Sequence, residues 1–238
     1  MHLTLNLSSL NLFLKVYLNM NNISKEDYLS AIYKYNDGKG AIKANQISAK
    51  LGISGAAVTD MLKKLSKNGY VNYEKYKGIK LTKNGEDYAR NIVRRHRIWE
   101  LFLHQVLGIP WDKVHEEAHN LEHGSSNDLI NRMEEMLDFP EFDPHGDPIP
   151  DKNGKMPKSE KGVPLSSIKP GVKVRVTRVH DFDSSFLQYI SNIGIELNKE
   201  LKVINVLAFD RSLLINIDKK EINISSKLAA NIFVKEFK

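Results

Sequence analysis

The sequence predicts a mainly α-helical chain with small β elements: a winged helix-turn-helix, a helical middle region and a small β-barrel. Three observations support this fold class. Two short helical patterns meet at a glycine and are followed by a hairpin pattern. A run of amphipathic helical segments comes next, and residues 165–238 contain several short stretches in which apolar and polar side chains alternate.

The N-terminal helical patterns indicate a helix-turn-helix. Residues 24–36 have apolar positions at helical spacing after a capping serine. Residues 44–51 form one short amphipathic face, which Gly52 interrupts. Ser54 can then cap a second helix that ends near Gly69. Two helices joined by a short turn containing glycine are typical of this motif.

The stretch that follows, VNYEKYKGIKLT, alternates and turns at residues 76–78, which predicts a β-hairpin. A hairpin directly after a recognition helix is a wing. Both elements carry basic side chains that suit a polyanion, namely Lys63, Lys64, Lys67, Lys75, Lys77 and Lys80. The alternative is a small helical domain with a hairpin and no role in DNA binding.

If the motif reads DNA, the start of the second helix should approach the bases. Small side chains there permit close approach, and methyl groups can contact thymine. The expected base-proximal residues are Ser54, Ala56, Ala57, Thr59 and Asp60. The expected phosphate contacts are Lys63, Lys64, Tyr76 and Lys77.

The middle of the chain should be helical. One long helix is expected over residues 83–108, and a second, which Asp112 can cap, carries HEEAHNLEH. A third is expected in residues 126–137. Residues 138–150 hold four of the eight prolines, so the helices should end there.

The last third of the chain should form a separate β structure. Residues 151–164 are polar and rich in Lys, Gly and Pro, which is typical of a linker. Residues 172–179 alternate strictly, as in a half-buried strand. The stretches LKVINVLAF, SLLINIDKKEINIS and NIFVKEF supply further short strands, so we expect a five-stranded barrel.

Composition limits the chemistry and the location. The chain has no cysteine, which excludes disulfides and thiolate zinc sites and leaves His, carboxylate and carbonyl ligands for any metal. It lacks an apolar run long enough for a membrane span, and we expect a cytoplasmic protein. The apolar residues 1–19 lack the basic start and the small-residue cleavage site of a signal peptide. We interpret them as a leader or loose arm before a natural start at Met20.

Charge is unevenly distributed. Residues 20–90 hold 13 Lys and Arg against 7 Asp and Glu, which suits nucleic acid. Residues 91–147 hold 5 against 12, which suits cations.

Metal-ligand side chains gather in this acidic region. On a helix, His115, His119, Glu122 and His123 fall on one face, because they are spaced at i, i+4, i+7 and i+8. His96 and Glu100 form another i, i+4 pair on the preceding helix. Such a stripe is a poor core face, since buried polar groups need partners. A metal site therefore explains this stripe better than a chance grouping of surface residues does.

The same stretch also fits the H-E-x-x-H pattern, so a zinc metalloprotease is the alternative, with Glu116 as general base. Two features weigh against it. Glu122 and His123 crowd the same helix, which tends to close the coordination sphere that hydrolysis needs open. A basic winged-helix module also precedes the motif.

Several stretches resemble the diphtheria toxin repressor family of metal-dependent transcriptional repressors: EDYLSAIY, LGISGAAVTDMLKKLSKNGYV, RRHRIWELFL, DKVHEEAHNLEH and PHGDPIP. The tail from Leu165 resembles the SH3-like, FeoA-type domain that many members carry. The resemblance implies a winged helix-turn-helix in residues 20–90, a metal-binding dimerisation domain in 91–150, a linker in 151–164 and an SH3-like domain in 165–238.

The resemblance also implies the ligands. One metal would bind Asp27, His119, Glu122 and His123, and a second would bind His96, Glu100 and His115. Further ligands would be Asp143 or His145, and in the tail Asp181 or Asp183, of which we choose Asp181. The chain departs from iron-type members, which usually have Cys at the position of His119 and Met at that of Asp27. A site without sulfur leaves Mn²⁺ or Fe²⁺ as the cofactor, with Zn²⁺ or Co²⁺ able to bind in vitro.

The implied function is a metal-dependent repressor of metal-ion homeostasis genes, and not an enzyme. It would bind a palindromic double-stranded DNA operator as a homodimer, with no membrane partner.

Overall fold

The structure is a computed structural model that describes residues 25–35, 41–74, 77–158, 162–181 and 183–237. The predictions for the leader 1–19, for the serine cap of the first helix and for Lys75 and Tyr76 lie outside the described residues. The chain divides into two compact units between Val93 and Arg94.

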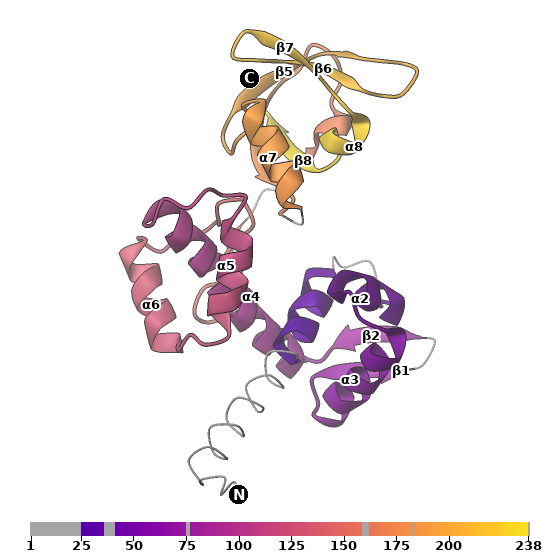
Figure 1. The fold of residues 1–238 in the computed structure, drawn as a ribbon, viewed down its shortest axis with the longest axis vertical. Coiled ribbons are helices and arrows are strands. Elements are labelled where there is room, and N and C mark those ends of the chain that lie inside the picture. The colour runs from indigo at the N-terminus through magenta and orange to yellow at the C-terminus, as the bar shows by residue number, and fades with distance from the viewer. Residues whose placement is uncertain (1–24, 36–40, 75–76, 159–161, 182, 238) are drawn as a thin grey trace, which may run out of the picture. The chain divides into compact units, whose positions relative to one another are not determined.

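The N-terminal unit is a winged helix-turn-helix (Figure 1), which confirms the predicted motif. Its elements are a helix over residues 25–35, α2 (Ala44–Leu51), α3 (Gly55–Lys67), β1 (Val71–Glu74), β2 (Gly78–Leu81) and the first part of α4 (Lys83–Gln105). The hairpin strands pair antiparallel from Val71 opposite Leu81 to Glu74 opposite Gly78. Apolar side chains from the three short helices and the hairpin form one core.

Local signals explain where these elements begin and end. Gly52 ends α2 in the left-handed conformation at φ 65°, which glycine adopts without steric cost. The Ser54 hydroxyl caps α3 by accepting a hydrogen bond from the Ala57 amide at 3.2 Å. Gly85 lets α4 approach the backbone of Tyr70, because a Cβ there would lie 1.9 Å from the Tyr70 carbonyl oxygen.

The C-terminal unit begins with helices. The rest of α4 packs with α6 (Asn127–Met136) around buried Ile98, Leu101, Ile130, Met133 and Ile149. It packs with α5 (Val114–Glu122) around buried Leu103, Val114 and Ala118. The long helix ends at Gln105, three residues before the expected end. The prediction that Asp112 caps the next helix is wrong. Lys113 precedes α5 without a side-chain cap, and the Asp112 carboxylate instead accepts a hydrogen bond from Gln188 at 2.9 Å.

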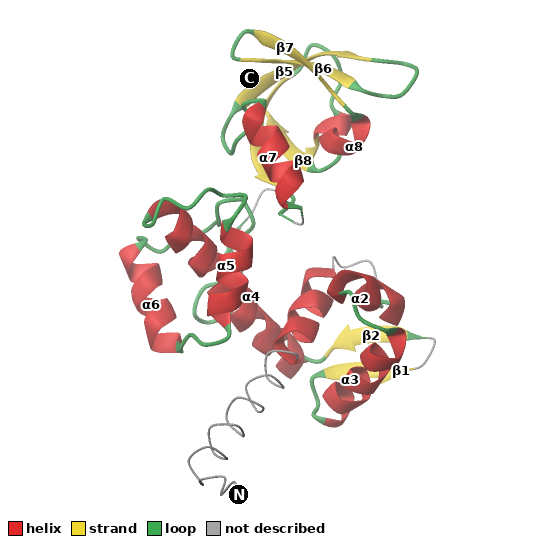
Figure 2. Ribbon diagram, in the orientation of Figure 1, coloured by secondary structure: helices red, strands yellow, loops and turns green. Residues whose placement is uncertain are grey.

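The tail is a curled antiparallel sheet with two short helices beside it (Figure 2). Its strands are β3 (Val163–Pro164), β4 (Lys173–Val179), β5 (Glu200–Val206), β6 (Leu213–Ile217), β7 (Lys220–Ile224) and β8 (Ile232–Glu236), in the order β3-β8-β4-β5-β6-β7. A 3-10 turn, η1 (Leu165–Ser167), follows β3. The expected five strands are joined by a sixth, β3, whose two residues are too short to show alternation.

The two tail helices, α7 (Ser184–Asn192) and α8 (Ser226–Ala229), were not expected from the sequence. Leu187 and Ile190 of α7 are buried in the sheet core, so this helix closes the barrel. Its start does have a local signal, since the Asp183 side chain accepts hydrogen bonds from the Ser185 and Phe186 amides. No helix in the described part of the chain is long and apolar enough to cross a membrane.

Candidate metal centre

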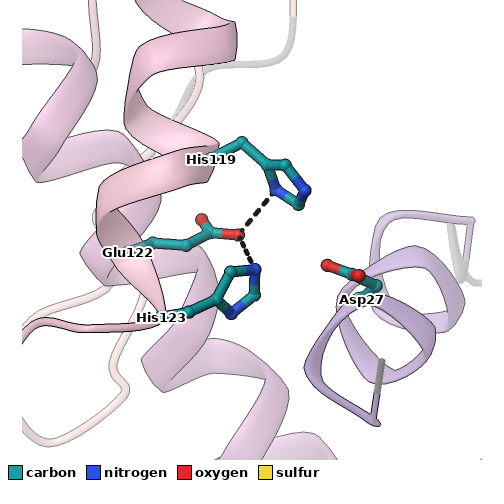
Figure 3. A group of neighbouring side chains, drawn as sticks. All are labelled: Asp27, His119, Glu122 and His123. Carbon is teal, nitrogen blue, oxygen red and sulfur yellow. Dashed lines mark hydrogen bonds and ion pairs between the residues drawn. The ribbon is translucent and has the colours of Figure 1, made fainter. Parts of the chain in front are cut away.

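Three side chains of the α5 stripe converge at the end of that helix. His119, Glu122 and His123 point to the same side, as Figure 3 shows. Glu122 is buried, and its Oε1 atom lies 3.0 Å from Nδ1 of His119 and 3.3 Å from Nε2 of His123. Asp27, also labelled in Figure 3, belongs to the N-terminal unit, where it lies partly exposed on the helix over residues 25–35. Helical spacing alone explains why the three α5 residues share a face.

A second group joins α4 to α5. One carboxylate oxygen of Glu100, Oε1, lies 3.0 Å from His96 Nε2 and 2.9 Å from His115 Nδ1. The two imidazole nitrogens are themselves 3.0 Å apart. Glu100 is fully buried, whereas the His115 side chain is 39% exposed. Three ligand atoms from two helices therefore meet at one point.

The tail contributes one carboxylate to this group. Oδ2 of Asp181 lies 3.5 Å from Nδ1 of His115. Asp183, the other tail candidate, is used as the cap of α7. The geometry therefore favours Asp181 over Asp183.

A third group shares Glu100. Ligand atoms of Glu100, Asp143 and His145 lie within 4.8 Å of one another, and all three residues are buried. One oxygen of Asp143 accepts hydrogen bonds from the backbone amides of His145 and Asp147, each at 2.9 Å. Oε2 of Glu100 and Nδ1 of His145 are buried and have no hydrogen-bond partner among the described residues. Burying a polar atom without a partner costs free energy, so a bound ligand at these two atoms would stabilise the structure.

Neighbouring histidines keep two carboxylates of the site ionised. Burial raises the pKa of Glu122, but hydrogen bonds from His119 and His96 outweigh it and lower the pKa to about 2. Burial likewise opposes ionisation of Glu100, yet the charge of His96 and hydrogen bonds from His115 and His96 hold its pKa well below the usual range. These two carboxylates are therefore ready to act as anionic ligands at neutral pH.

The third group differs in protonation. Burial, together with the charges of Glu100 and Asp147, raises the pKa of Asp143 to about 7. For His145, burial lowers the pKa, but the charges of Glu100 and Asp143 outweigh it and raise the pKa. This group consequently holds protons near neutral pH that a bound cation would displace.

The residues fit a small divalent cation. Two donor atoms each about 2.1 Å from an ion and at right angles to each other lie about 3 Å apart. The contacts among His96, Glu100 and His115 are 2.9–3.0 Å. The donor set contains only imidazole nitrogen and carboxylate oxygen, which suits Mn²⁺, Fe²⁺ or Zn²⁺.

Comparison with known proteins identifies three modules. Residues 22–79 match the iron dependent repressor N-terminal DNA binding domain. Residues 82–151 match the iron dependent repressor metal binding and dimerisation domain, and residues 163–236 match the FeoA domain.

Individual relatives agree with these matches. An HTH-type transcriptional regulator of Methanocaldococcus jannaschii is 39% identical over 116 residues, which are 48% of this chain and 93% of that protein. The transcriptional regulator MntR of Bacillus subtilis is 33% identical over 120 residues, which are 50% of this chain and 84% of that protein.

Solved structures extend the likeness to the tail. A manganese-dependent transcriptional repressor in complex with manganese has a TM-score of 0.83 at 32% identity, over 90% of this chain and 100% of that chain. The repressor ScaR with bound Cd²⁺ has a TM-score of 0.77 at 30% identity, over 90% and 99%.

The chain belongs to the diphtheria toxin repressor family.

Members of the diphtheria toxin repressor family are metal-dependent, DNA-binding transcriptional regulators and not enzymes. Membership of the family therefore confirms the predicted metal-dependent transcriptional regulator and is evidence against the alternative, a zinc metalloprotease. The geometry agrees, because Glu116 is exposed on α5, whereas Glu100 and Glu122 are buried. His115 and His119, which the protease would use together, lie in different groups: His115 contacts Glu100, whereas His119 contacts Glu122.

This repressor presents the expected DNA-binding residues on α3 and the wing. Ala56, Ala57, Asp60, Lys63 and Lys64 are exposed. Ser54 is committed to capping, and the Thr59 hydroxyl donates to the Gly55 carbonyl at 2.8 Å. Lys77 pairs with Glu74 at 2.6 Å, and both are exposed, so the pair can open for a phosphate at little cost.

Sequence reasoning missed three charged residues next to the centre of this repressor, namely Arg97, Asp147 and Arg178. Arg97 Nε lies 3.4 Å from a carboxylate oxygen of Asp143, and its guanidinium also reaches Asp147 at 3.7 Å. Arg178 of β4 lies 3.4 Å from the same Asp147 oxygen. A signal existed for Arg97, which directly follows the ligand candidate His96 in a basic run. None existed for Asp147, whose role depends on the fold around it.

Proposed function

We propose that this repressor is activated by Mn²⁺ or Fe²⁺ and, when loaded, binds a palindromic operator as a homodimer to control metal-ion homeostasis genes. The observation that carries the proposal is the meeting of His96, Glu100 and His115 donor atoms at 2.9–3.0 Å within the region that matches the metal binding and dimerisation domain. A regulator of this kind acts where the DNA is, so we also propose a cytoplasmic location.

We assign the ligands to two neighbouring sites. His96, Glu100 and His115, with Asp143, His145 and Asp181, would surround one centre, and its sixfold supply of N and O donors suits Mn²⁺ or Fe²⁺. His119, Glu122 and His123 would hold a second ion. From the family resemblance, we propose that Asp27 completes that second site.

The domain roles follow the same proposal. Residues 20–90 would read DNA, 91–150 would bind metal and form the dimer, 151–164 would link, and 165–238 would form the SH3-like domain. A bound cation supplies positive charge that neutralises the gathered carboxylates. Asp27 lies ahead of the helix-turn-helix in sequence, so its ligation would fix the reading head relative to the dimerisation region. By linkage, a metal that favours the DNA-competent form must strengthen DNA binding.

DNA recognition is assigned to α3 and the wing. Ala56, Ala57 and Thr59 would contact base edges, while Ser54 and Asp60 would lie at the same end of the helix. Lys63, Lys64, Tyr76 and Lys77 would contact phosphates. Because the helix-turn-helix of each protomer enters one major groove, a two-fold dimer requires half-sites with two-fold symmetry.

The direct test uses metal-dependent DNA binding. Operator duplexes are first selected from a random library with the full chain and Mn²⁺, and affinity is then measured by fluorescence anisotropy with Mn²⁺, Fe²⁺, Co²⁺, Zn²⁺ or a chelator. We expect at least a tenfold gain with Mn²⁺ or Fe²⁺. Equal affinity with metal and with chelator would refute the proposal.

A parallel assay addresses hydrolysis. The Zn²⁺-loaded chain is incubated with casein alongside Glu116→Gln, which removes only the carboxylate that a protease would need. We expect no turnover from either protein, and turnover lost in Glu116→Gln would contradict the assignment.

A further inference from the structure

We infer that Trp111 is a positioning residue, which orients His145 toward the metal and fastens the tail domain to the same centre. The inference rests on the proposed function, since it takes His145 as a ligand. Trp111 lies between α4 and α5, where neither helix spacing nor the ligand motif draws attention to it. Its contacts to both partners are direct.

The first contact sets the state of the His145 ring. The Trp111 carbonyl oxygen lies 2.9 Å from Nε2 of His145. A carbonyl can only accept, so Nε2 carries the hydrogen, and in the neutral ring Nδ1 carries the lone pair. The indole also stacks on the imidazole, with centroids 5.7 Å apart and an angle of 23° between the planes. Trp111 thus decides both the tautomer and the ring plane.

That orientation matches the needs of a metal ligand. Nδ1 of His145 is buried with no hydrogen-bond partner in the described part of the chain. A ring nitrogen of His145 lies within 4.8 Å of carboxylate oxygens of Glu100 and Asp143. A ligating histidine usually donates its other ring N–H to a carbonyl or carboxylate, which fixes the ring for the metal. Here the donated hydrogen goes to the backbone of Trp111.

The second contact joins the tail. The indole Nε1 donates to the Ser191 hydroxyl of α7 at 2.5 Å, and the ring packs against the tail core. The adjacent Asp112 accepts a hydrogen bond from Gln188, one turn earlier on α7, at 2.9 Å. Two neighbouring residues therefore hold one face of α7.

His145 itself completes the connection. Its carbonyl oxygen accepts a hydrogen bond from the Val179 amide at the end of β4, at 2.9 Å. Two residues further on, Asp181 reaches His115 at 3.5 Å. The tail is thus attached to the centre through α7 and through the end of β4, and Trp111 contacts His145 and α7 together. By linkage, metal held by His145 must tighten tail attachment, and tail attachment must raise metal affinity by the same factor.

The test compares three variants of the full chain. Ser191→Ala removes only the acceptor of the indole N–H. Trp111→Leu also removes the stacked ring, while Trp111→Phe keeps an aromatic ring, and both variants keep the backbone carbonyl that faces His145. Ser225→Ala is the matched control, because Ser225 caps α8 inside the tail by accepting from the Leu228 amide and touches neither partner. Ser191→Ala keeps the inference testable if Trp111→Leu fails to fold.

Two readouts are needed, and neither is DNA binding. Mn²⁺ titration followed by electron paramagnetic resonance gives the number and affinity of sites. Hydrogen exchange by mass spectrometry reports the Val179 amide and α7 with and without Mn²⁺. In the wild-type chain and in Ser225→Ala, we expect Mn²⁺ to slow exchange there by about 5- to 150-fold.

In Ser191→Ala we expect this protection to fall, and in Trp111→Leu to vanish. Affinity of the site containing His145 should drop about 10- to 100-fold in Trp111→Leu, with Trp111→Phe between it and wild type. The site of His119, Glu122 and His123 should keep its affinity in every variant, which a general loss of stability would not predict.

The outcomes separate the two proposals. If all variants bind Mn²⁺ and protect Val179 as the wild type does, the Trp111 side chain has no positioning role, although metal binding stands. If the wild-type chain binds no Mn²⁺, the proposed function fails, and this inference fails with it.

Discussion

Nδ1 of His96 lies 2.7 Å from Oε2 of Glu122, and both side chains are buried. The other ring nitrogen of His96 faces Glu100 at 3.0 Å. One imidazole therefore bridges a carboxylate of the α5 stripe and a carboxylate of the second group. In metal sites, a carboxylate behind a histidine orients the ring and raises its basicity. The two groups are consequently connected through His96.

Replacing Glu122 by Gln should therefore weaken metal binding at both sites. The stripe loses an anionic ligand, and His96 loses the carboxylate behind it, so the site of His96, Glu100 and His115 should bind Mn²⁺ about 10- to 100-fold more weakly. Mn²⁺ titration by electron paramagnetic resonance measures both affinities. Glu117→Gln, exposed on the same helix, is the control. An unchanged second site in Glu122→Gln would show that the groups are independent.

Glu100 should be the most sensitive position. It is fully buried, and it belongs to two of the three ligand groups. We expect Glu100→Gln, which keeps the size but not the charge, to lower Mn²⁺ affinity by more than the roughly 100-fold of a supporting residue. Metal-dependent DNA binding should be lost with it. Glu116→Gln should retain both properties, and wild-type Mn²⁺ affinity in Glu100→Gln would remove Glu100 from the ligand set.

The metal-free protein should lose stability as the pH rises toward neutral. The pKa of Asp143 is about 7 in the folded protein, whereas an aspartate in the unfolded chain has a pKa of about 3.9. Between these values the folded state binds more protons, so the free energy of unfolding should fall by up to about 1.4 kcal/mol per pH unit. The raised pKa of His145 acts in the same direction near neutrality, because stability from its protonated form is lost as the pH passes the folded pKa.

At low pH the sign reverses. The pKa of Glu122 is about 2, so its stabilising contribution is present above the unfolded value and is lost as the pH falls. Urea denaturation of chelator-treated protein across this range should show maximal stability at mildly acidic pH. Asp143→Asn should flatten the decline toward neutral pH. A stability that rises steadily up to about pH 8 would contradict the expectation.

Lys64 should contribute to DNA affinity without sequence preference. It is exposed on α3, and neutralising a phosphate releases counterions. With two copies in a dimer, Lys64→Ala should reduce the slope of log affinity against log salt by about 2. Fluorescence anisotropy on selected and on unrelated duplexes measures both slopes. Lys202 is exposed in the tail, so Lys202→Ala should leave both slopes unchanged. A wild-type slope in Lys64→Ala would show that Lys64 does not contact a phosphate.

Gly85 should be intolerant of any side chain. A Cβ there would lie 1.9 Å from the Tyr70 carbonyl oxygen, so the start of α4 must move away from the winged module. We expect Gly85→Ala to lower the free energy of unfolding of the N-terminal unit by about 3 kcal/mol. Gly55→Ala is the matched control, since its Cβ would meet nothing within 4 Å. Thermal denaturation measures the unfolding midpoint of both variants, and equal midpoints would contradict the predicted clash at residue 85.

Local patterns in the sequence predict much of the fold and part of the centre. The periodicity of 3.6 residues decides which side chains share a helix face, so the spacing of His119, Glu122 and His123 is enough to group them. Capping by Ser54 and the glycine at the end of α2 likewise depend on neighbouring residues only. The alternating strands of the tail follow the same logic, with a period of two.

Tertiary structure determined which residues that are far apart in the sequence come into contact. Only the packing of α4 against α5 brings His115 to Glu100 rather than to His119. Only the course of the chain after β4 places Asp181 beside His115 and leaves Asp183 to cap α7. Asp112 has the composition of a helix cap, yet it bonds to Gln188 across the tail contact. The physical reason is that dihedral preferences and side-chain periodicity act over a few residues. The meeting of two segments depends instead on how all their buried faces pack together.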